Sequence, residues 1–237
     1  MNDDSTGRPA SLEDATQAAP PAGADHARRW VGLLRAMEPL KHLPRTGWVD
    51  RGVGDPESVA AHSWRLAMLA FVVASDLGLN AAHAMALALI HDLPEAITGD
   101  HTPFGSLATE QSDPRDWRRP AARAEKTMAE RAALARIVAA GGAHVAAEIV
   151  GIWEDYVAEQ SPEARLIHQL DKLEAYLQGW EYAADGRLAR PDTLRSFQID
   201  CDQLVTEPAA RFLLEAIEEW AGAATLLGGG NRELKPE

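Results

Sequence analysis

The chain is poor in cysteine and in basic side chains, and each shortage limits what the protein can be. Cys201 is the only cysteine among 237 residues, so no intramolecular disulfide can form. A lone thiol is typical of a reducing compartment, and we expect a cytoplasmic protein. Lys and Arg number 23 against 36 Asp and Glu, a formal net charge of −13. This balance argues against partners such as nucleic-acid polymers or anionic membranes, because both need basic patches.

Long apolar runs are also missing. No uninterrupted apolar stretch is long enough to cross a bilayer, and the first residues do not resemble a secretory signal. Residues 1–24 are rich in Ala, Pro, Asp, Ser and Thr, which predicts a disordered tail. Residues 225–237 contain three consecutive glycines and are predicted to be a flexible C-terminal tail. We therefore expect one folded domain over residues 25–224.

Within this domain the apolar periodicity is helical almost everywhere, and no convincing strand alternation is present. Helices are predicted over residues 25–37, 58–76, 81–91, 121–140, 143–158, 162–184, 191–206 and 208–223. Two long irregular segments, near residues 38–57 and 99–120, are punctuated by proline and glycine. Loops of that length are usually functional or disordered. The predicted fold class is all-α.

Four ionisable side chains lie at the edges of apolar helix faces. His62 falls within the apolar stripe of its helix, and Asp171 flanks the stripe of another. His91 and Asp92 directly follow a buried-type apolar run. Buried charges are costly unless they are paired or bind a metal, and helical bundles build metal sites from facing helices. Taken together, these residues predict one buried divalent metal site.

Each of the four residues also has a plain structural interpretation. A lone buried histidine such as His62 is more often a core residue than a ligand, and Asp171 alone could be a solvated charge. His91 and Asp92 alone could be an ordinary helix end. Only their joint occurrence favours the metal. Two imidazoles and two carboxylates suit Mn²⁺, Co²⁺ or Zn²⁺, and Mg²⁺ or Fe²⁺ is also compatible.

The order His, His-Asp, Asp resembles the pattern of the HD-domain superfamily of metal-dependent phosphohydrolases, and the chain is most similar to its 5′-deoxynucleotidases. Three stretches carry the resemblance, namely RTGW with PESVAAHS in residues 45–63, HDLPEAITGD in residues 91–100, and SPEAR with LDKLE in residues 161–174. It covers residues 33–181. The resemblance implies an HD-domain helical bundle with a buried metal between helices. It also implies hydrolysis of (deoxy)ribonucleoside 5′-monophosphates to nucleoside and phosphate.

Matching positions imply roles for single residues. The implied metal ligands are His62, His91, Asp92 and Asp171. Glu95 matches the catalytic carboxylate, and a carboxylate beside a metal-bound water can act as general acid or base. Asp100 matches a position near the sugar of the substrate. Without the resemblance, Glu95 would be an ordinary acidic residue at the start of a helix, and Asp100 would be a polar residue that favours a turn.

The remaining implied contacts show two departures from the family. Trp48 matches an aromatic residue that packs by the substrate. The phosphate-binding arginine of the family has no direct counterpart, because Gly47 stands at that spacing before the first histidine. Arg45 or Arg51 substitutes, and we favour Arg45. Ala61 replaces the acidic residue that usually precedes the first histidine, which bears on metal affinity or substrate choice.

Three alternative functions remain open. The first is another phosphohydrolase of this superfamily, acting on a nucleoside triphosphate, an alarmone or a secondary-metabolite nucleotide. The second is a di-iron oxygenase of the same fold, which needs extra histidines, and Glu95 disfavours it by standing four residues after His91. The spare histidines for a second metal are His83, His101, His144 and His168. The third is an inactive binding module, against which the complete ligand set and Glu95 argue.

The quaternary state rests on the resemblance, which favours a homodimer. The C-terminal helices carry apolar residues that suit either the core or a dimer interface, namely Leu204, Phe212, Leu213, Ile217 and Trp220. A small nucleotide is the expected substrate and partner.

Overall fold

The structure, a computed structural model, describes residues 22–100, 120–188 and 191–229. Every regular element in these ranges is a helix, apart from one isolated bridge between Pro44 and Ser58. The all-α prediction is confirmed. No helix in the described ranges is long and apolar enough to cross a membrane.

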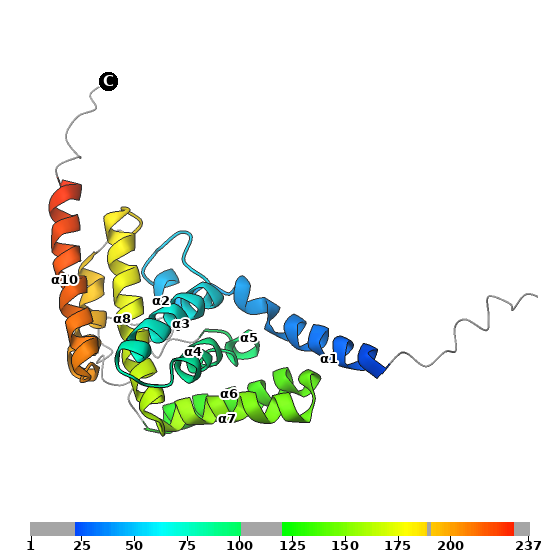
Figure 1. Cartoon of the computed structure of the whole chain (residues 1–237). Helices are drawn as coiled ribbons and strands as arrows, with labels where there is room; N and C mark the ends of the chain where they lie inside the picture. The colour runs from blue at the N-terminus through cyan, green and yellow to red at the C-terminus, as the bar shows by residue number, and fades with distance from the viewer. Residues whose placement is uncertain (1–21, 101–119, 189–190, 230–237) are drawn as a thin grey trace, which may run out of the picture.

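Figure 1 shows how the helices are arranged. The α-helices are α1 (Ala22–Met37), α2 (Thr46–Val49), α3 (Val59–Asp76), α4 (Ala81–Ile90), α5 (Glu95–Thr98), α6 (Pro120–Val138), α7 (Ala143–Ala158), α8 (Pro162–Ala184), α9 (Arg195–Leu204) and α10 (Pro208–Gly229). Single 3₁₀ turns are η2 (Glu38–Lys41), η5 (Ala139–Gly141) and η6 (Pro191–Leu194).

The predicted helices all occur, with small differences at their ends. The first begins at Ala22 rather than near residue 25, and α10 continues to Gly229, past the predicted start of the C-terminal tail. The first irregular segment contains the short η2 and α2. Three predicted segments lie largely outside the described residues, namely residues 1–21 of the tail predicted over 1–24, most of the second irregular segment, and residues 230–237 of the C-terminal tail.

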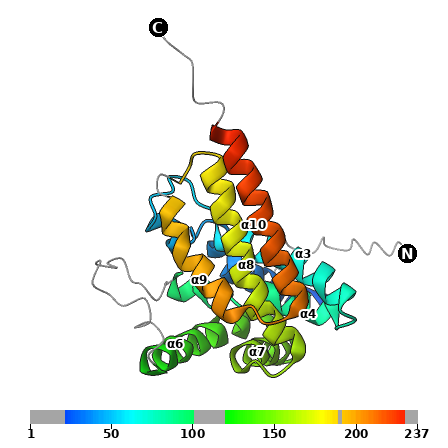
Figure 2. The same ribbon diagram turned by 90° about the vertical axis from the view of Figure 1, so that its left-hand side faces the viewer.

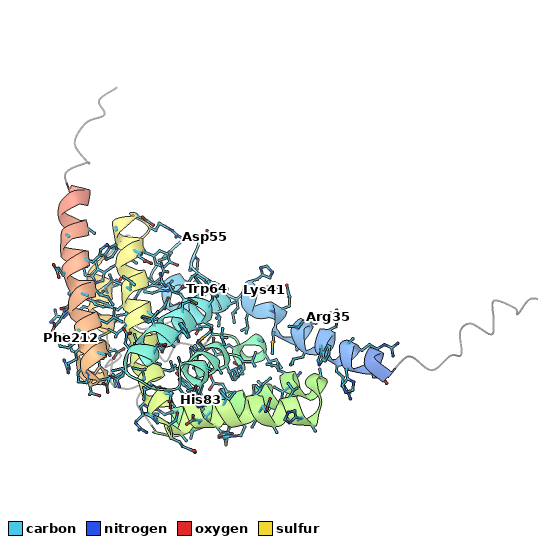
Figure 3. All side chains as sticks on the ribbon, viewed as in Figure 1. Arg35, Lys41, Asp55, Trp64, His83 and Phe212 are labelled. Carbon is cyan, nitrogen blue, oxygen red and sulfur yellow. The ribbon has the colours of Figure 1, made fainter. Side chains whose placement is uncertain are left out.

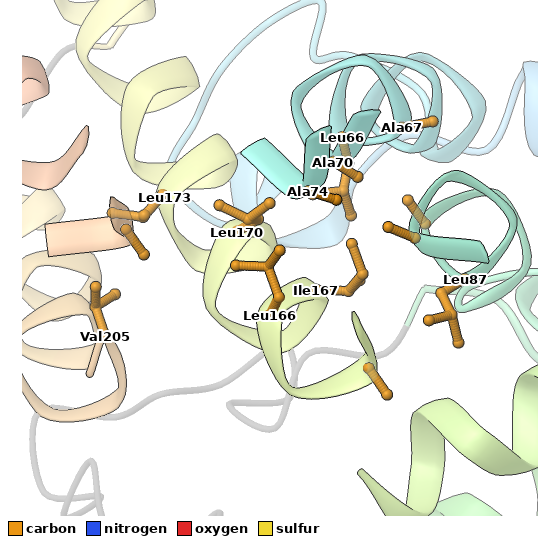
Figure 4. Close-up of a cluster of buried hydrophobic side chains, with 14 of the residues drawn as sticks. Leu66, Ala67, Ala70, Ala74, Leu87, Leu166, Ile167, Leu170, Leu173 and Val205 are labelled. Atoms are coloured by element: carbon orange, nitrogen blue, oxygen red, sulfur yellow. The ribbon is translucent and has the colours of Figure 1, made fainter. Parts of the chain in front are cut away.

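The main core lies between α3, α4 and α8, with α9 and α10 packed on the far side of α8 (Figures 1 and 2). Apolar side chains at helical spacing meet there, including Leu66 of α3, Leu87 of α4, and Ile167 and Leu170 of α8. Figure 4 shows these side chains converging between the three helices. This core holds rigidly the three segments that carry the predicted metal ligands.

Two smaller clusters support the segments around the site. Leu93 packs with α6 and α7 residues such as Leu134 and Trp153, which joins the turn after α4 to these helices. Trp48 packs with Tyr182 of α8 and Leu194 of η6, which fixes the segment around α2. Both clusters therefore position loops that the sequence pattern marks as functional.

Local capping sets the register of the two long ligand-bearing helices. The Ser58 hydroxyl accepts the backbone N–H of Ala61 and starts α3, so His62 lies one turn inside the helix. The Ser161 hydroxyl accepts the N–H of Ala164 at the start of α8. Such caps stabilise a helix start by about 1 kcal/mol.

Candidate metal centre

His62, His91 and Asp171 converge on one point in the core. His62 comes from α3, His91 from the end of α4 and Asp171 from α8, and each is at most 5% exposed. One ligand-type atom from each lies within 4.8 Å of the other two. The structure therefore brings together three residues that are separated by up to 109 positions in the sequence, as the helical pattern predicts.

Both imidazole rings are held with Nε2 toward this point. The Nδ1 atom of His62 lies 2.5 Å from Glu174 Oε2, and the Nδ1 atom of His91 lies 2.8 Å from the Ala88 carbonyl oxygen. Each Nε2 atom is buried and makes no hydrogen bond of regular geometry with the described residues, and its polar neighbour is a carboxylate oxygen at 3.1 Å. Since imidazole nitrogens and carboxylate oxygens gathered in this way are ligands for a divalent ion, and metal-binding histidines are oriented through the other ring nitrogen, the residues fit such an ion.

Asp92, the fourth predicted ligand, lies next to this cluster. Its Oδ2 atom lies 3.1 Å from His91 Nε2 and 2.8 Å from Arg45 Nη1. Arg45 also approaches Asp171, with 3.9 Å between Nη2 and Oδ1. Burial opposes ionisation of Asp92, but His91 and Arg45 outweigh it and lower the pKa of this carboxyl. Asp92 is therefore a carboxylate that can coordinate a cation.

Asp171 and His62 are coupled directly, with Asp171 Oδ1 3.1 Å from His62 Nε2. Although burial disfavours its charge, Lys172 and His62 hold the pKa of Asp171 well below its ordinary value. Burial and Arg45 oppose protonation of His62, but Glu174 and Asp171 prevail and raise its pKa to about 9. A divalent ion would replace that proton.

Glu174 is a site residue that the sequence analysis did not single out. It is 2% exposed and bridges His62 Nδ1 and Arg65 Nε, the latter at 2.7 Å. Arg65 in turn contacts Glu181, with Nη1 2.6 Å from Oε2. Glu174 stands three residues after Asp171, and this spacing on one helix face was the available signal.

Glu95 begins α5 beside the cluster. The turn survives Pro94, because the Glu95 N–H donates to the Asp92 carbonyl at 3.0 Å. Its side chain is 3% exposed and Oε2 has no hydrogen-bond partner among the described residues. Burial, together with the charges of Asp92 and Asp100, raises the pKa of Glu95 well above its ordinary value. This carboxyl can therefore retain a proton next to the candidate metal ligands.

Asp100 and Arg45 connect the site to the segment before α2. Asp100 Oδ2 accepts the Thr46 N–H at 2.7 Å, and its carbonyl accepts the Thr46 hydroxyl. Arg45 points at the metal ligands, whereas Arg51 donates to the Gly47 carbonyl at 2.7 Å and lies 4.5 Å from the centre of the Phe197 ring. This placement favours Arg45 over Arg51 as the cation at the site.

Trp48 is placed differently from the expectation. It is 2% exposed and stacks on Phe197 at 4.9 Å, with its edge toward Tyr182 at 5.4 Å. The indole N–H donates to Glu57 at 3.1 Å. At 2% exposure this side chain has almost no surface left to cover a base or sugar, and its position indicates support of the α2 segment.

Ala61 lies on the exposed side of α3, although it precedes the buried His62. A larger acidic side chain at this position would start from the exposed helix face. The presence of alanine instead of an acidic residue at position 61 therefore removes no contact with the buried His62 ring.

Two residues of α6, the helix that packs against α5, lie near the site although sequence patterns did not indicate them. Lys126 and Glu130 of α6 form a pair with 3.2 Å between Nζ and Oε1. The Lys126 side chain is 45% exposed, and it lies on the Glu95 side of the site because α6 packs against α5. An i, i+4 pair of this kind is indistinguishable in sequence from an ordinary surface salt bridge.

The spare histidines do not assemble a second centre among the described residues. His83 Nε2 lies 2.7 Å from Asp155, and His144 is exposed near Glu148. His168 Nε2 donates to the Tyr156 carbonyl at 2.9 Å. His101 lies outside the described residues. This arrangement disfavours the di-iron alternative.

A helical bundle with two histidines and two aspartates gathered between its helices defines a class of metal-binding α-proteins. The chain belongs to the HD domain family, whose model matches residues 37–208.

The chain is similar in sequence to curated 5′-deoxynucleotidases and in structure to a protein of known structure. The chain is 32% identical over 197 residues to the 5′-deoxynucleotidase HDDC2 of Danio rerio, which spans 83% of this chain and 90% of that protein. It is 36% identical over 156 residues to the human protein of the same name, spanning 66% and 69%. A conserved hypothetical protein from Pyrococcus furiosus has a similar structure, with a TM-score of 0.58, 29% identity, and coverage of 80% of this chain and 97% of that one.

Proposed function

We propose that the protein is a metal-dependent phosphomonoesterase that hydrolyses (deoxy)ribonucleoside 5′-monophosphates to nucleoside and phosphate. One observation carries the proposal, namely the convergence of His62, His91 and Asp171 on one buried point beside the protonatable Glu95. Membership of the HD domain family and the names of the relatives support this reaction class.

His62, His91, Asp92 and Asp171 would hold one divalent ion, with Mn²⁺, Co²⁺ or Zn²⁺ best suited to this donor set. Such an ion, when bound, polarises the phosphate and lowers the pKa of a coordinated water. Glu174 orients the His62 ring, and the Ala88 carbonyl orients the His91 ring. These contacts fix which nitrogen of each ring faces the ion.

Glu95 moves the proton in the proposed reaction. Its carboxyl lies beside Asp92 and keeps a proton to higher pH than an exposed glutamate. It either protonates the leaving 5′-oxygen or, as the carboxylate, positions the attacking water. Its Oε2 atom has no competing protein partner among the described residues, so it is available for either role.

Arg45 and Asp100 would contact the substrate from the α2 side. The guanidinium of Arg45 neutralises phosphate charge and is already directed at the site by Asp92. Asp100 would accept the 3′-hydroxyl and help to reject a 2′-hydroxyl. Trp48 contributes by anchoring the segment that carries Arg45, through its packing against Tyr182 and Phe197.

The test is phosphate release from a panel of nucleoside and deoxynucleoside monophosphates. The Glu95→Ala variant should lose at least about 100-fold in kcat, because general acid–base catalysis contributes factors of about 10²–10⁴. Wild-type activity in this variant would contradict the role of Glu95. Release of pyrophosphate or triphosphate from nucleoside triphosphates, with no release from monophosphates, would favour the alternative substrate class.

We also propose that the enzyme works as a cytoplasmic homodimer on a small nucleotide. The single buried thiol of Cys201 is compatible with a reducing compartment. Large apolar side chains are exposed at helical spacing along one face of α3, where Figure 3 labels Trp64, namely Trp64, Met68, Phe71 and Val72. Exposed apolar groups of this size favour association. Light scattering on the purified protein should give twice the mass of one chain.

A further inference from the structure

Tyr156 of α7 lies against the candidate metal centre and has no role in the reaction proposed above. Its ring stacks on His168 of α8, with 4.0 Å between centroids and 6° between planes. On the other side it meets His91 edge to face at 5.4 Å. His168 is itself held, because its Nε2 atom donates to the Tyr156 carbonyl at 2.9 Å. The ring is therefore clamped in one orientation beside a metal ligand.

The ring of Tyr156 lies directly beside the candidate ligand His91. Burial and the nearby carboxylates of Asp171, Asp92 and Glu130 raise the pKa of the phenol well above its ordinary value, which indicates that the hydroxyl lies near these groups. Two of these are the candidate ligand carboxylates, and the side chain as a whole is only partly buried. The described residues supply no hydrogen-bond partner for the hydroxyl. Tyr156 thus presents a free O–H group among carboxylates at a partly open site.

A free hydroxyl in this setting matches an anionic oxygen. A phenol is neutral at physiological pH, so it can donate a hydrogen bond without adding positive charge. Hydrogen bonds donated to an ionised phosphate are about twice as strong as neutral ones. The donor comes from α7, whereas Arg45 comes from the segment before α2, and these two elements lie on opposite sides of α3 and α4 (Figure 1).

We propose that Tyr156 is a further substrate-binding residue, whose hydroxyl donates a hydrogen bond to a phosphoryl oxygen from the side opposite Arg45. The inference rests on the proposed function, since it assumes that a phosphate occupies the space between the two groups. The clamp by His168 and His91 pre-organises the donor, so little side-chain entropy is lost on binding.

The test compares Tyr156→Phe with the wild type in two measurements. Calorimetry with inorganic phosphate on the metal-loaded protein should show a Kd raised by about tenfold or more, as expected for a lost hydrogen bond to a charged group. In turnover, KM for a monophosphate should rise more than kcat falls. Tyr176→Phe is the matched control, because Tyr176 is buried in the main core and should leave both quantities unchanged.

Unchanged phosphate affinity in Tyr156→Phe would overturn the proposal and leave the ring with a packing role only. A second measurement avoids dependence on the variant. The chain has three tyrosines, so 3-fluorotyrosine labelling gives three resonances. Phosphate should shift the Tyr156 resonance of the metal-loaded protein and not that of Tyr176, and no shift would contradict the inference.

Failure of the inference and failure of the proposed function are separable. Phosphate binding is measured without turnover. A wild-type protein that binds phosphate through Tyr156 but releases none from monophosphates would refute the reaction and support the contact. If the wild type hydrolyses monophosphates and Tyr156→Phe binds phosphate with unchanged Kd, the reaction would be supported and the Tyr156 contact refuted.

Discussion

At the scale of single residues, the site depends on how its histidines are oriented. His62 is completely buried, and one of its nitrogens is committed to Glu174. Arg65 neutralises Glu174 from the other side at 2.7 Å. The chain from Arg65 through Glu174 to His62 keeps Nε2 directed at Asp171. The metal affinity should therefore depend on Glu174, although Glu174 would not itself bind the ion.

Replacing Glu174 by glutamine tests this dependence. The Glu174→Gln variant keeps the shape but removes the charge that holds His62, and loss of such a supporting contact typically costs about 10–100-fold in metal affinity. Competition with a fluorescent chelator measures the change. Glu181→Gln is the control, since Glu181 contacts the same Arg65 but not His62. Equal affinity in wild type and Glu174→Gln would refute the orienting role.

Metal affinity should also rise with pH. The pKa of His62 is raised to about 9 by Glu174 and Asp171 against the opposing effect of burial. Because a raised pKa means that the ring keeps its proton up to that value, the proton competes with the ion below it and ceases to compete above it. The metal Kd, measured by calorimetry between about pH 6 and 9, should fall steadily as the pH rises. A flat profile would contradict the coordination by His62.

At the scale of elements, α8 and the α2 segment approach each other closely at Gly179. A Cβ atom there would lie 2.4 Å from Leu194 Cδ2 and 3.0 Å from Trp48 Cη2. Glycine is favoured at this point because Leu194 and Trp48 both pack closely against the helix. This contact holds the segment that carries Arg45 to the helix that carries Asp171.

Gly179→Ala should lower the free energy of unfolding by about 1–3 kcal/mol, the usual cost of inserting a group into a packed core. Phosphate-ester hydrolysis should fall as well, because the displaced Trp48 moves the Arg45 segment. Urea denaturation gives the first quantity. Gly151→Ala on α7 is the control, since nothing lies within 4 Å of its Cβ position and alanine favours helix. Equal free energies of unfolding and equal activities in Gly179→Ala and Gly151→Ala would show that the close contact at Gly179 has no structural importance.

The sequence pattern was sufficient to predict the helices, because apolar spacing and capping residues act locally. The Val59–Asp76 helix and its inward histidine follow from one stripe and one N-cap serine. Contacts between distant segments leave no such local mark. Glu174 could be suspected from its spacing to Asp171, whereas Tyr156 and Lys126 reach the site only because α6 and α7 pack across α4 and α5. The burial of Trp48 likewise depends on Phe197, a residue far along the chain.

At the scale of the whole molecule, three helices of one core meet at the candidate metal centre. His62, His91 and Asp171 are attached to α3, the end of α4 and α8, which share the main cluster of buried side chains. An ion bound by all three would cross-link these helices. Since binding to the folded state alone stabilises it, removal of the ion should lower the thermal midpoint as well as the activity.

The most direct measurement is the metal content per chain, followed by phosphate release after the ion is removed and restored. The protein should bind one divalent ion per chain, lose monophosphate hydrolysis on chelation and regain it with Mn²⁺, Co²⁺ or Zn²⁺. The double variant His62→Ala and Asp171→Ala should bind none and stay inactive. Full hydrolysis by the metal-free protein, or two irons per chain in the active form, would contradict the account.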